Sequence, residues 1–277
     1  MTHDRGNEPR FAFGANWLRF ISHLDEARVR SAESSLQSAL RTSTLDGRTF
    51  LDVGSGSGLF SLAASRLGAA RVHSFDFDSE SVECTRLLKA RFAPQLETWT
   101  IEHGDVTDEH YCAALGAFDD VYCFGVLHHT GSMWQALDNV LGCVAPEGRV
   151  FVSIYNDQGR TSARWRRVKR LYHRLPTRLR PLFAAGVWGP FELREAAHGL
   201  VHGPRAYLGT WTNRDRGMSK WHDIVDWIGG YPFEVAKPER VLDGCHVRGF
   251  ELTGLQTVNG SLACNEFLFV RHAEQPV

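Results

Sequence analysis

Apolar and polar positions follow two alternating periods between residues 46 and 156. Five short apolar runs are typical of buried strands, and three intervening stretches repeat their apolar residues at helical spacing. The runs lie at 49–53, 71–75, 97–103, 118–124 and 148–154, and the predicted helices lie at 59–67, 79–92 and 133–143. Strands that alternate with helices in this way favour a parallel sheet with helices on both faces. Residues 46–156 are therefore predicted to form an α/β, doubly wound core.

The chain on either side of this core follows other patterns. Residues 1–45 hold an aromatic segment and a predicted helix over 22–41, and the aromatic segment either folds over a ligand as a lid or anchors the chain. Residues 157–236 show no convincing strand and are interpreted as a largely helical insert. Residues 237–277 resume with a helix, and Asn259-Gly260 between two strand-like runs indicates a hairpin. We expect a seven-stranded sheet that ends in a C-terminal antiparallel hairpin.

The composition is that of an ordinary soluble globular protein. The 277 residues are 43% hydrophobic and 23% charged, with a formal net charge of -1, so the whole chain carries no electrostatic footprint for nucleic acid or membrane. No apolar run approaches the roughly 18 to 20 residues of a spanning helix, and the polar N-terminus lacks the apolar segment of a signal peptide. The six cysteines include no C-x-x-C pair and are expected to be reduced thiols. We expect a cytoplasmic protein with no metal site and no clear protein partner.

The most distinctive motif is the run LDVGSGSGLF at residues 51–60. An apolar strand leads into Gly54, Gly56 and Gly58 and then into a helix, and glycine lets a backbone approach a ligand closely at a helix N-terminus. A dinucleotide-binding loop places its third glycine one residue later, where this chain has Leu59. The spacing therefore disfavours a nicotinamide-dependent oxidoreductase. The alternative is a tight strand-to-helix turn that binds nothing.

Four further segments flank the later strands. Asp76 ends the second strand, Gly104-Asp105-Val106 follows the third, Phe124-Gly125-Val126-Leu127-His128-His129 follows the fourth, and Pro146-Glu147-Gly148-Arg149 precedes the fifth. Together with the glycine loop and Asp52, they resemble the motifs of class I S-adenosylmethionine (SAM) dependent methyltransferases. The resemblance is nearest to the ubiquinone- and menaquinone-type small-molecule enzymes. It covers residues 48–156 and 237–270 and implies a Rossmann-like fold.

The resemblance implies SAM as the cofactor. Asp76 would accept hydrogen bonds from both ribose hydroxyls, and Asp105 would meet the adenine amino group. The residues expected at the cofactor are Asp52, Gly54, Ser55, Gly56, Gly58, Asp76, Phe77, Asp105, Val106, Phe124, Gly125 and, from the N-terminal segment, Trp17. Other roles stay open for the acids: Asp76 as a helix cap, Asp105 as a turn former, and Asp52 as a residue that only orients the glycine loop.

Methyl transfer from a sulfonium is an in-line displacement, so a base is needed only where the nucleophile carries a proton. The candidate bases are His128, His129, Asp157 and His222. Adjacent side chains diverge on an extended segment, so we expect at most one of His128 and His129 to face the acceptor. Tyr155, Asn156 and Trp221 are expected to border the acceptor pocket. Each base candidate has a structural alternative: a loop-shaping histidine, a solvated acid, or a helix N-terminus at His222-Asp223.

A basic stretch lies within the insert. Nine Arg or Lys residues occur from 160 to 180, and the apolar residues among them repeat at helical spacing, so we predict one amphipathic helix that ends before Pro176. Three interpretations compete: a solvated face packed on the core, a surface for anionic lipid or a lipid-linked substrate, and a contact with RNA phosphates. The neutral overall charge makes the RNA interpretation the least favoured.

These observations predict SAM-dependent methyl transfer to a small-molecule or lipid- or sugar-linked acceptor, on oxygen, nitrogen or sulfur. Peripheral membrane contact is part of this hypothesis, and nucleic acid is not the expected partner. One alternative is an RNA methyltransferase that uses the basic helix. Another is a SAM-fold protein that binds without catalysis.

Overall fold

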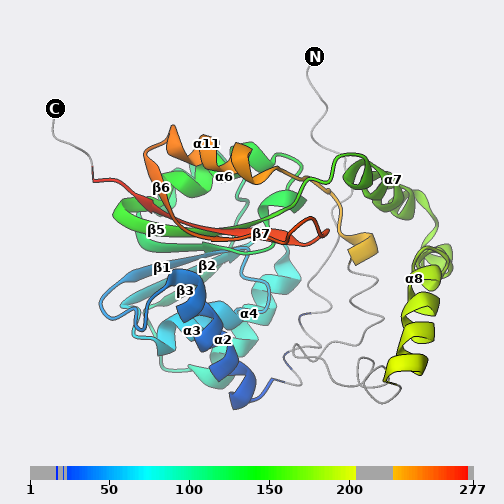
Figure 1. Cartoon of the computed structure of the whole chain (residues 1–277). Helices are drawn as coiled ribbons and strands as arrows, with labels where there is room; N and C mark the ends of the chain where they lie inside the picture. Colours follow the sequence, from blue (N-terminus) through cyan, green and yellow to red (C-terminus); the bar gives the residue numbers. More distant parts are fainter. Residues whose placement is uncertain (1–16, 18–20, 22–23, 204–226, 274–277) are drawn as a thin grey trace. The chain divides into compact units, whose positions relative to one another are not determined.

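The computed structural model describes residues 17, 21, 24–203 and 227–273. The chain divides into two compact units. The larger one holds Ala12–Ser162 and Glu234–Val277, and the smaller one holds Ala163–Phe233 with Met1–Phe11. The large unit carries the sheet and all the strands named below, and the small unit carries most of α7 and all of α8 (Figure 1).

The large unit is built on one seven-stranded sheet of order β3-β2-β1-β4-β5-β7-β6. The first five strands are parallel, whereas β7 pairs antiparallel with both β5 and β6. The strands are β1 (Thr49–Val53), β2 (Arg71–Asp76), β3 (Trp99–His103), β4 (Phe118–Cys123), β5 (Val144–Tyr155), β6 (Phe250–Gln256) and β7 (Cys264–Arg271). The predicted seven-stranded, doubly wound sheet with a C-terminal antiparallel hairpin is confirmed.

Helices cover both faces of this sheet (Figure 1). Helices α2 (Glu26–Leu40), α3 (Leu59–Arg66) and α4 (Ser79–Phe92) share one core cluster with Phe50 of β1. Helices α5 (Glu109–Leu115), α6 (Met133–Gly142) and α11 (Pro238–His246) share the other with Leu51 and Val53. Because successive strand residues point to opposite faces, β1 contributes to both cores, and its residues from Phe50 to Val53 are buried.

Three local predictions need correction. The helix predicted over 22–41 begins at Glu26, because Asp25 is its N-cap and accepts a hydrogen bond from the Arg28 backbone. The strand predicted from 148 begins at Val144, so the Pro146–Arg149 segment lies inside β5, beside a register irregularity with β4. Helix α5 was not predicted, although Asp108 caps it in the usual way. Its seven residues are too few to show a helical period.

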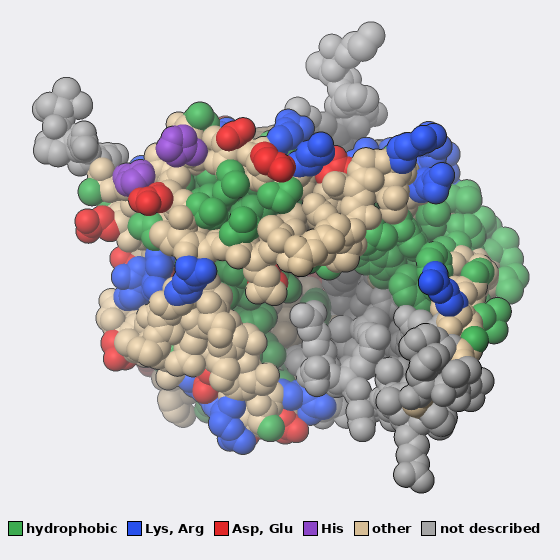
Figure 2. All heavy atoms as spheres, viewed as in Figure 1, with side chains coloured by type: hydrophobic (Ala, Val, Ile, Leu, Met, Phe, Trp, Pro, Cys, Tyr) green, Lys and Arg blue, Asp and Glu red, His purple; other side chains and the backbone are tan. Residues whose placement is uncertain are grey.

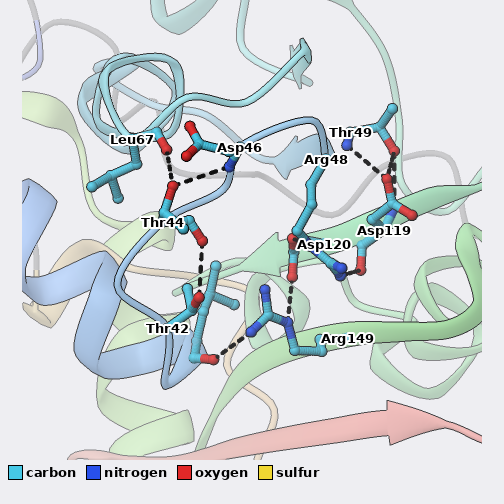
Figure 3. A network of polar contacts seen from close by, with 10 residues as sticks. Thr42, Thr44, Asp46, Arg48, Thr49, Leu67, Asp119, Asp120 and Arg149 are labelled. Carbon is cyan, nitrogen blue, oxygen red and sulfur yellow. Dashed lines mark hydrogen bonds and ion pairs between the residues drawn. The ribbon is translucent and has the colours of Figure 1, made fainter.

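Polar and charged side chains join β1, β4 and β5 near the amino ends of β1 and β4 (Figure 3). Asp120 is fully buried and lies 2.5 Å from Arg48 Nε and 2.6 Å from Arg149 Nε. Asp119 accepts hydrogen bonds from the Thr49 backbone and hydroxyl. Each buried carboxylate here therefore has a cationic or hydrogen-bonding partner, which anchors three strands together.

The small unit is helical. Helix α7 (Arg160–Arg174) enters it and is followed by a 3₁₀ turn η2 (Thr177–Leu179) and by α8 (Arg180–His202). Tyr172, Ala184 and Ile228 form its small buried core. The amphipathic helix predicted from residue 160 is confirmed, and it ends at Arg174, just ahead of Pro176.

One row of basic side chains on α7 contacts the 227–233 segment. Lys169 is fully buried, donates to the Trp227 carbonyl, and lies 4.3 Å and 4.9 Å from the ring centres of Trp227 and Phe233. Arg166 Nε donates to the Phe233 carbonyl, and a His173 ring nitrogen lies within hydrogen-bonding distance of the Gly229 carbonyl. Burial lowers the pKa of Lys169 to about 7. This row of α7 therefore holds the 227–233 segment through its carbonyl groups.

Candidate functional site

The glycine loop lies between β1 and α3. The backbone amides of Gly54 and Ser55 both donate to the Phe75 carbonyl, at 2.9 and 3.0 Å, which ties the loop to the end of β2. Gly54, Gly56 and Gly58 all have φ between 54° and 76°, a left-handed conformation that side chains with a Cβ rarely adopt. The backbone conformation of this turn therefore favours glycine at all three positions.

Neighbouring side chains also press on the loop. A Cβ on Gly54 would lie 2.3 Å from Val126 Cγ2, and one on Gly58 would lie 2.7 Å from Thr85 Cγ2. A Cβ on Gly56 would lie 3.1 Å from the indole ring of Trp17. The N-terminal tryptophan therefore covers the middle of the loop, and Val126 brings the segment after β4 against its start.

Asp76 ends β2 beside this loop. Its Oδ2 accepts from the Gly56 amide and its Oδ1 from the Asp78 amide, each at 2.9 Å. The N-cap of α4 is Asp78, whose side chain accepts from the Glu80 amide. The alternative in which Asp76 caps that helix is therefore wrong, and the Asp76 carboxylate is fixed against the glycine loop instead.

Asp52 lies one layer deeper and is 3% exposed. Its Oδ2 accepts a hydrogen bond from the Ser61 hydroxyl, which lies 2.7 Å from the Ser74 hydroxyl. The Trp99 indole donates to that same Ser74 oxygen at 2.7 Å. This chain of hydroxyls crosses β1, α3, β2 and β3, and sequence reasoning did not foresee it, because its four members are separated along the chain.

The two carboxyl groups share one electrostatic property. Burial raises the pKa of Asp52 to about 7, and the nearby charge of Asp76 adds to this effect. Burial likewise raises the pKa of Asp76 to about 6, against the hydrogen bonds from Asp78 and Gly56. Within the described part of the chain, neither carboxylate forms an ion pair with a basic side chain. The site therefore holds acids that a cationic ligand would stabilise in their charged form.

The other residues predicted at the cofactor lie around the same strand ends. Phe77 follows Asp76 with 48% of its side chain exposed, 5.9 Å from the His103 ring. Asp105 Oδ1 accepts from the amide and hydroxyl of Thr107 at 2.9 and 2.8 Å, which is a turn-forming contact. Val106 is 5% exposed and packs into the core.

Phe124 and Gly125 follow β4. Phe124 extends a stack of aromatic rings that includes Tyr122 and Phe151. Gly125 has φ 78°, and its amide donates to the Ser153 hydroxyl at 2.8 Å. This turn directs the chain from β4 into the histidine pair.

The two histidines do not diverge, which corrects the prediction. Leu127–His129 is a 3₁₀ turn rather than an extended segment, and the ring centres of His128 and His129 lie 4.5 Å apart. Tyr155, at the end of β5, lies 4.0 Å from the His128 ring and 5.6 Å from the His129 ring. His128 is 1% exposed, whereas His129 is half-buried. Burial raises the pKa of the Tyr155 hydroxyl, so this group stays protonated at neutral pH.

Glu234 is the site residue that sequence reasoning missed. Its amide donates to the His128 carbonyl at 2.9 Å, and its Oε2 accepts from the Met133 amide at 3.1 Å. Two residues on, the Ala236 amide donates to the Tyr155 carbonyl at 3.0 Å. Residues 234–236 therefore hold together the His128–His129 turn, the start of α6 and the end of β5. No local pattern identifies a carboxylate that acts about 100 residues away.

The remaining candidates are divided. Asn156 Oδ1 accepts from Asn265 Nδ2 at 3.2 Å, which fixes it to β7. Asp157 Oδ1 accepts from the Gly159 amide at 2.8 Å, as a turn-forming loop acid does. Trp221 and His222 lie outside the described residues. Among the residues that the structure describes, no group of three or more His, Cys, Asp or Glu side chains is arranged to hold a metal ion.

Comparison with known proteins identifies the central part of the chain. Residues 51–152 match the family described as methyltransferase domain. The ubiquinone biosynthesis O-methyltransferase of Sodalis glossinidius is 31% identical over 116 residues, which make up 42% of this chain and 45% of that protein. The chain thus spans less than half the length of the first curated relatives it matches.

Solved structures resemble nearly the whole chain. The magnesium protoporphyrin IX methyltransferase of Synechocystis PCC 6803, with bound SAH, has a TM-score of 0.52 at 14% identity and covers 96% of this chain and 91% of its own. The cyclase SpnF has a TM-score of 0.53 at 12% identity, over 88% and 81% of the two chains. These likenesses confirm the Rossmann-like fold.

Proposed function

We propose that the chain is a class I SAM-dependent methyltransferase that transfers a methyl group from SAM to a small-molecule acceptor, a proposal supported by the methyltransferase domain that residues 51–152 match. The observation that carries the proposal is a pair of acids, the buried Asp52 and the half-buried Asp76, beside a left-handed glycine loop and without a basic partner among the described residues. SAM supplies an activated methyl group on a positively charged sulfur.

The chemistry of this donor set fits the cofactor. An ionised Asp76 has oxygen lone pairs for the two ribose hydroxyls, in addition to the amides that it already accepts from. Asp52 is too deeply buried to reach a ligand freely, and its hydroxyl chain to Ser61 supports a role in holding the loop. The exposed ring of Phe77 offers an apolar face for the adenine, and Asp105 is proposed to meet the adenine amino group.

Trp17 is proposed as a cofactor cover. Its indole packs against Gly56, and a ring in that position would exclude water from the bound nucleoside. The proposal that the N-terminal segment acts as a lid rests on this residue alone, because its other members, Phe11, Asn16 and Arg19, lie outside the described residues.

We propose His129 as the base when the acceptor is a hydroxyl or another protonated group. It is half-buried, whereas His128 is enclosed behind it, so only His129 has a surface to offer an acceptor. His128 then positions His129 through the contact between their rings and through the ring of Tyr155. Glu234 is a positioning residue, because it holds the carbonyl side of His128 and the start of α6.

The acceptor is proposed to be a small molecule, and methylation on oxygen has the support of the similarity to a ubiquinone biosynthesis O-methyltransferase. Two alternatives have weaker support. RNA methylation would use the basic helix α7, but one row of that helix is occupied within the small unit. A protein that uses the fold without methyl transfer is the other alternative, since fold alone does not fix the reaction.

The test is incubation of the protein with methyl-labelled SAM and a pool of cell-extract metabolites, followed by mass spectrometry of labelled products. We expect a labelled small molecule with the native chain and none with Asp76→Ala. His129→Ala should abolish labelling of a hydroxyl acceptor. His129→Gln keeps a polar side chain that cannot act as a base, and it should abolish labelling as well. SAM binding by calorimetry without any labelled product would favour the non-catalytic alternative. Labelled RNA would favour the RNA methyltransferase alternative.

A further inference from the structure

The outer surface of α7 and the turn that follows it carry arginine without acidic neighbours. Residues 158–191 contain no Asp or Glu. Seven arginines on this stretch are exposed, and five of them make no hydrogen bond to the 227–233 segment: Arg160, Arg164, Arg167, Arg174 and Arg178. Among the described residues none of them forms an ion pair. This differs from Arg166 and Lys169, which the small unit uses internally.

Large apolar side chains stand exposed beside these arginines. Leu171 and Leu179 are each 48% exposed and Leu182 is 72% exposed. Leu171 follows Arg160, Arg164 and Arg167 on one side of α7, because their spacing of three or four residues repeats the helical period. Leu179 and Leu182 belong to η2 and the first turn of α8. We call Arg164, Arg167, Leu171, Arg174, Arg178, Leu179 and Leu182 the arginine–leucine face.

Figure 2 shows the same mixture, with blue side chains over α7 and green hydrophobic side chains beside them toward α8. Exposed leucines lose free energy in water and gain it in an apolar phase. Exposed arginines without counter-ions attract an anionic surface. A surface that combines exposed leucines with exposed arginines is typical of a protein segment that lies in a membrane interface. There the arginines contact lipid phosphates and the leucines enter the acyl boundary.

We propose that the arginine–leucine face binds the surface of a bilayer that contains anionic phospholipid. Helix α7 lies along the interface, and the η2 turn inserts Leu179 and Leu182. The described chain has no helix that is both long and apolar enough to cross a membrane, so this contact is peripheral. Nucleic acid would use the arginines but not the leucines, which is why a lipid surface accounts for more of the face. The proposal stands apart from methyl transfer and does not require it.

The experiment is co-sedimentation of the full chain with vesicles of equal parts phosphatidylglycerol and phosphatidylcholine, beside vesicles of phosphatidylcholine alone. We expect binding to the anionic vesicles at 50 mM salt that weakens strongly at 500 mM, because salt screens the arginines. Arg174→Gln with Arg178→Gln should lower the vesicle affinity by about 25-fold, from about fivefold for each arginine. Leu179→Ser with Leu182→Ser should lower it by at least about tenfold.

The matched controls remove the same number of exposed arginines or apolar side chains from the large unit, away from the arginine–leucine face. Arg30→Gln with Arg86→Gln removes two exposed arginines from α2 and α4, and Leu87→Ser with Val247→Ser removes two exposed apolar side chains of the large unit. Both should bind vesicles within about twofold of the native chain. Circular dichroism of every variant checks that it is folded.

Several results would overturn the proposal. One is equal binding to both kinds of vesicle, and another is no binding to anionic vesicles at 50 mM salt. A third is retention on a single-stranded RNA homopolymer that the arginine variant loses and the leucine variant keeps. A fourth is a dimer, seen by light scattering, that the leucine variant splits without any change in vesicle binding. None of these measurements uses SAM or an acceptor, so they leave the proposed methyl transfer untouched.

Discussion

The carboxylates at the two ends of the central sheet differ in their partners and in the direction of their pKa shifts. At the amino ends, Asp120 lies between two arginines, and the pKa of Asp119 is lowered because hydrogen bonds from Thr49 and the arginine charges outweigh its partial burial (Figure 3). At the carboxyl ends, burial raises the pKa values of Asp52 and Asp76 to about 7 and about 6. The carboxylates at the first end are paired, whereas among the described residues Asp52 and Asp76 at the second end form no ion pair with a basic side chain.

This difference teaches where a ligand belongs. A buried acid with a cationic partner stabilises the fold only while both partners are present. A buried acid without one destabilises its own charged form, and a protein retains it where something else supplies the charge. The carboxyl ends of parallel strands are also where open α/β sheets bind ligands. The contrast makes four predictions, beginning with the largest effect.

Asp120→Ala should lower the free energy of unfolding by about 3 kcal/mol, because it leaves Arg48 and Arg149 without their shared carboxylate. The value is at the lower end for a buried pair, since the Arg48 side chain is 34% exposed. Urea unfolding measures the change. The SAM affinity of the folded variant should stay that of the native chain, and a loss of affinity here would break the separation between the two ends.

Asp76→Ala should weaken SAM binding by about a hundredfold, because hydrogen bonds to a charged acceptor contribute about 1.5–3 kcal/mol each. Calorimetry measures the affinity. The stability of the free protein should change little, because the relief of a desolvated charge offsets the loss of the acceptor for the Gly56 and Asp78 amides. Asp78→Asn is the matched control: it removes the neighbouring charge, keeps the N-cap of α4, and should leave the affinity within a few fold.

The pH dependence should have opposite signs for stability and binding. Because the pKa values of Asp52 and Asp76 are raised, these two groups bind more protons in the folded protein than in the unfolded chain between about pH 4 and pH 7. The stability that they contribute is therefore fully present below pH 4 and is lost as pH rises through the folded pKa values. SAM affinity should instead rise by about tenfold from pH 5.5 to 7.5, because a cationic ligand favours the ionised acids.

Thermal unfolding across this range and calorimetry in two buffers of different ionisation enthalpy measure both effects. Asp52→Asn should flatten the fall in stability and raise the stability of the free protein above pH 7, the reverse of the loss expected for Asp120→Ala. A SAM affinity that does not vary with pH, or a stability that rises from pH 4 to 7, would contradict this account.

Glu234→Ala should give an effect no larger than that of pH, a fall in kcat of about tenfold with the KM for SAM unchanged. The reason is that a small misplacement of the histidine turn slows transfer without touching the cofactor. Glu234→Gln keeps an oxygen for the Met133 amide and should recover most of the rate. Glu239→Ala removes an exposed acid from the first turn of α11 and should change nothing. A fall in stability alone, with kcat unaltered, would reduce Glu234 to a structural residue.

The sequence by itself determined the sheet, because hydrophobic period, strand length and turn glycines are local properties. The bounds of β1 and α4 agree to the residue with those predicted from the apolar pattern. The spacing of the loop glycines indicated a turn that needs glycine, and all three have positive φ. Where the local signal was short or misleading, prediction failed: α5 has only seven residues, and the histidine pair was read as extended.

The tertiary structure alone decided the electrostatics and the grouping of the site. The hydroxyl chain from Asp52 to Trp99 joins four elements. Glu234 reaches the turn after β4 from the end of the insert, and Lys169 of the basic helix is buried. Burial and partner choice depend on residues that are distant along the chain. A pKa, which depends on both, therefore cannot be read from sequence spacing.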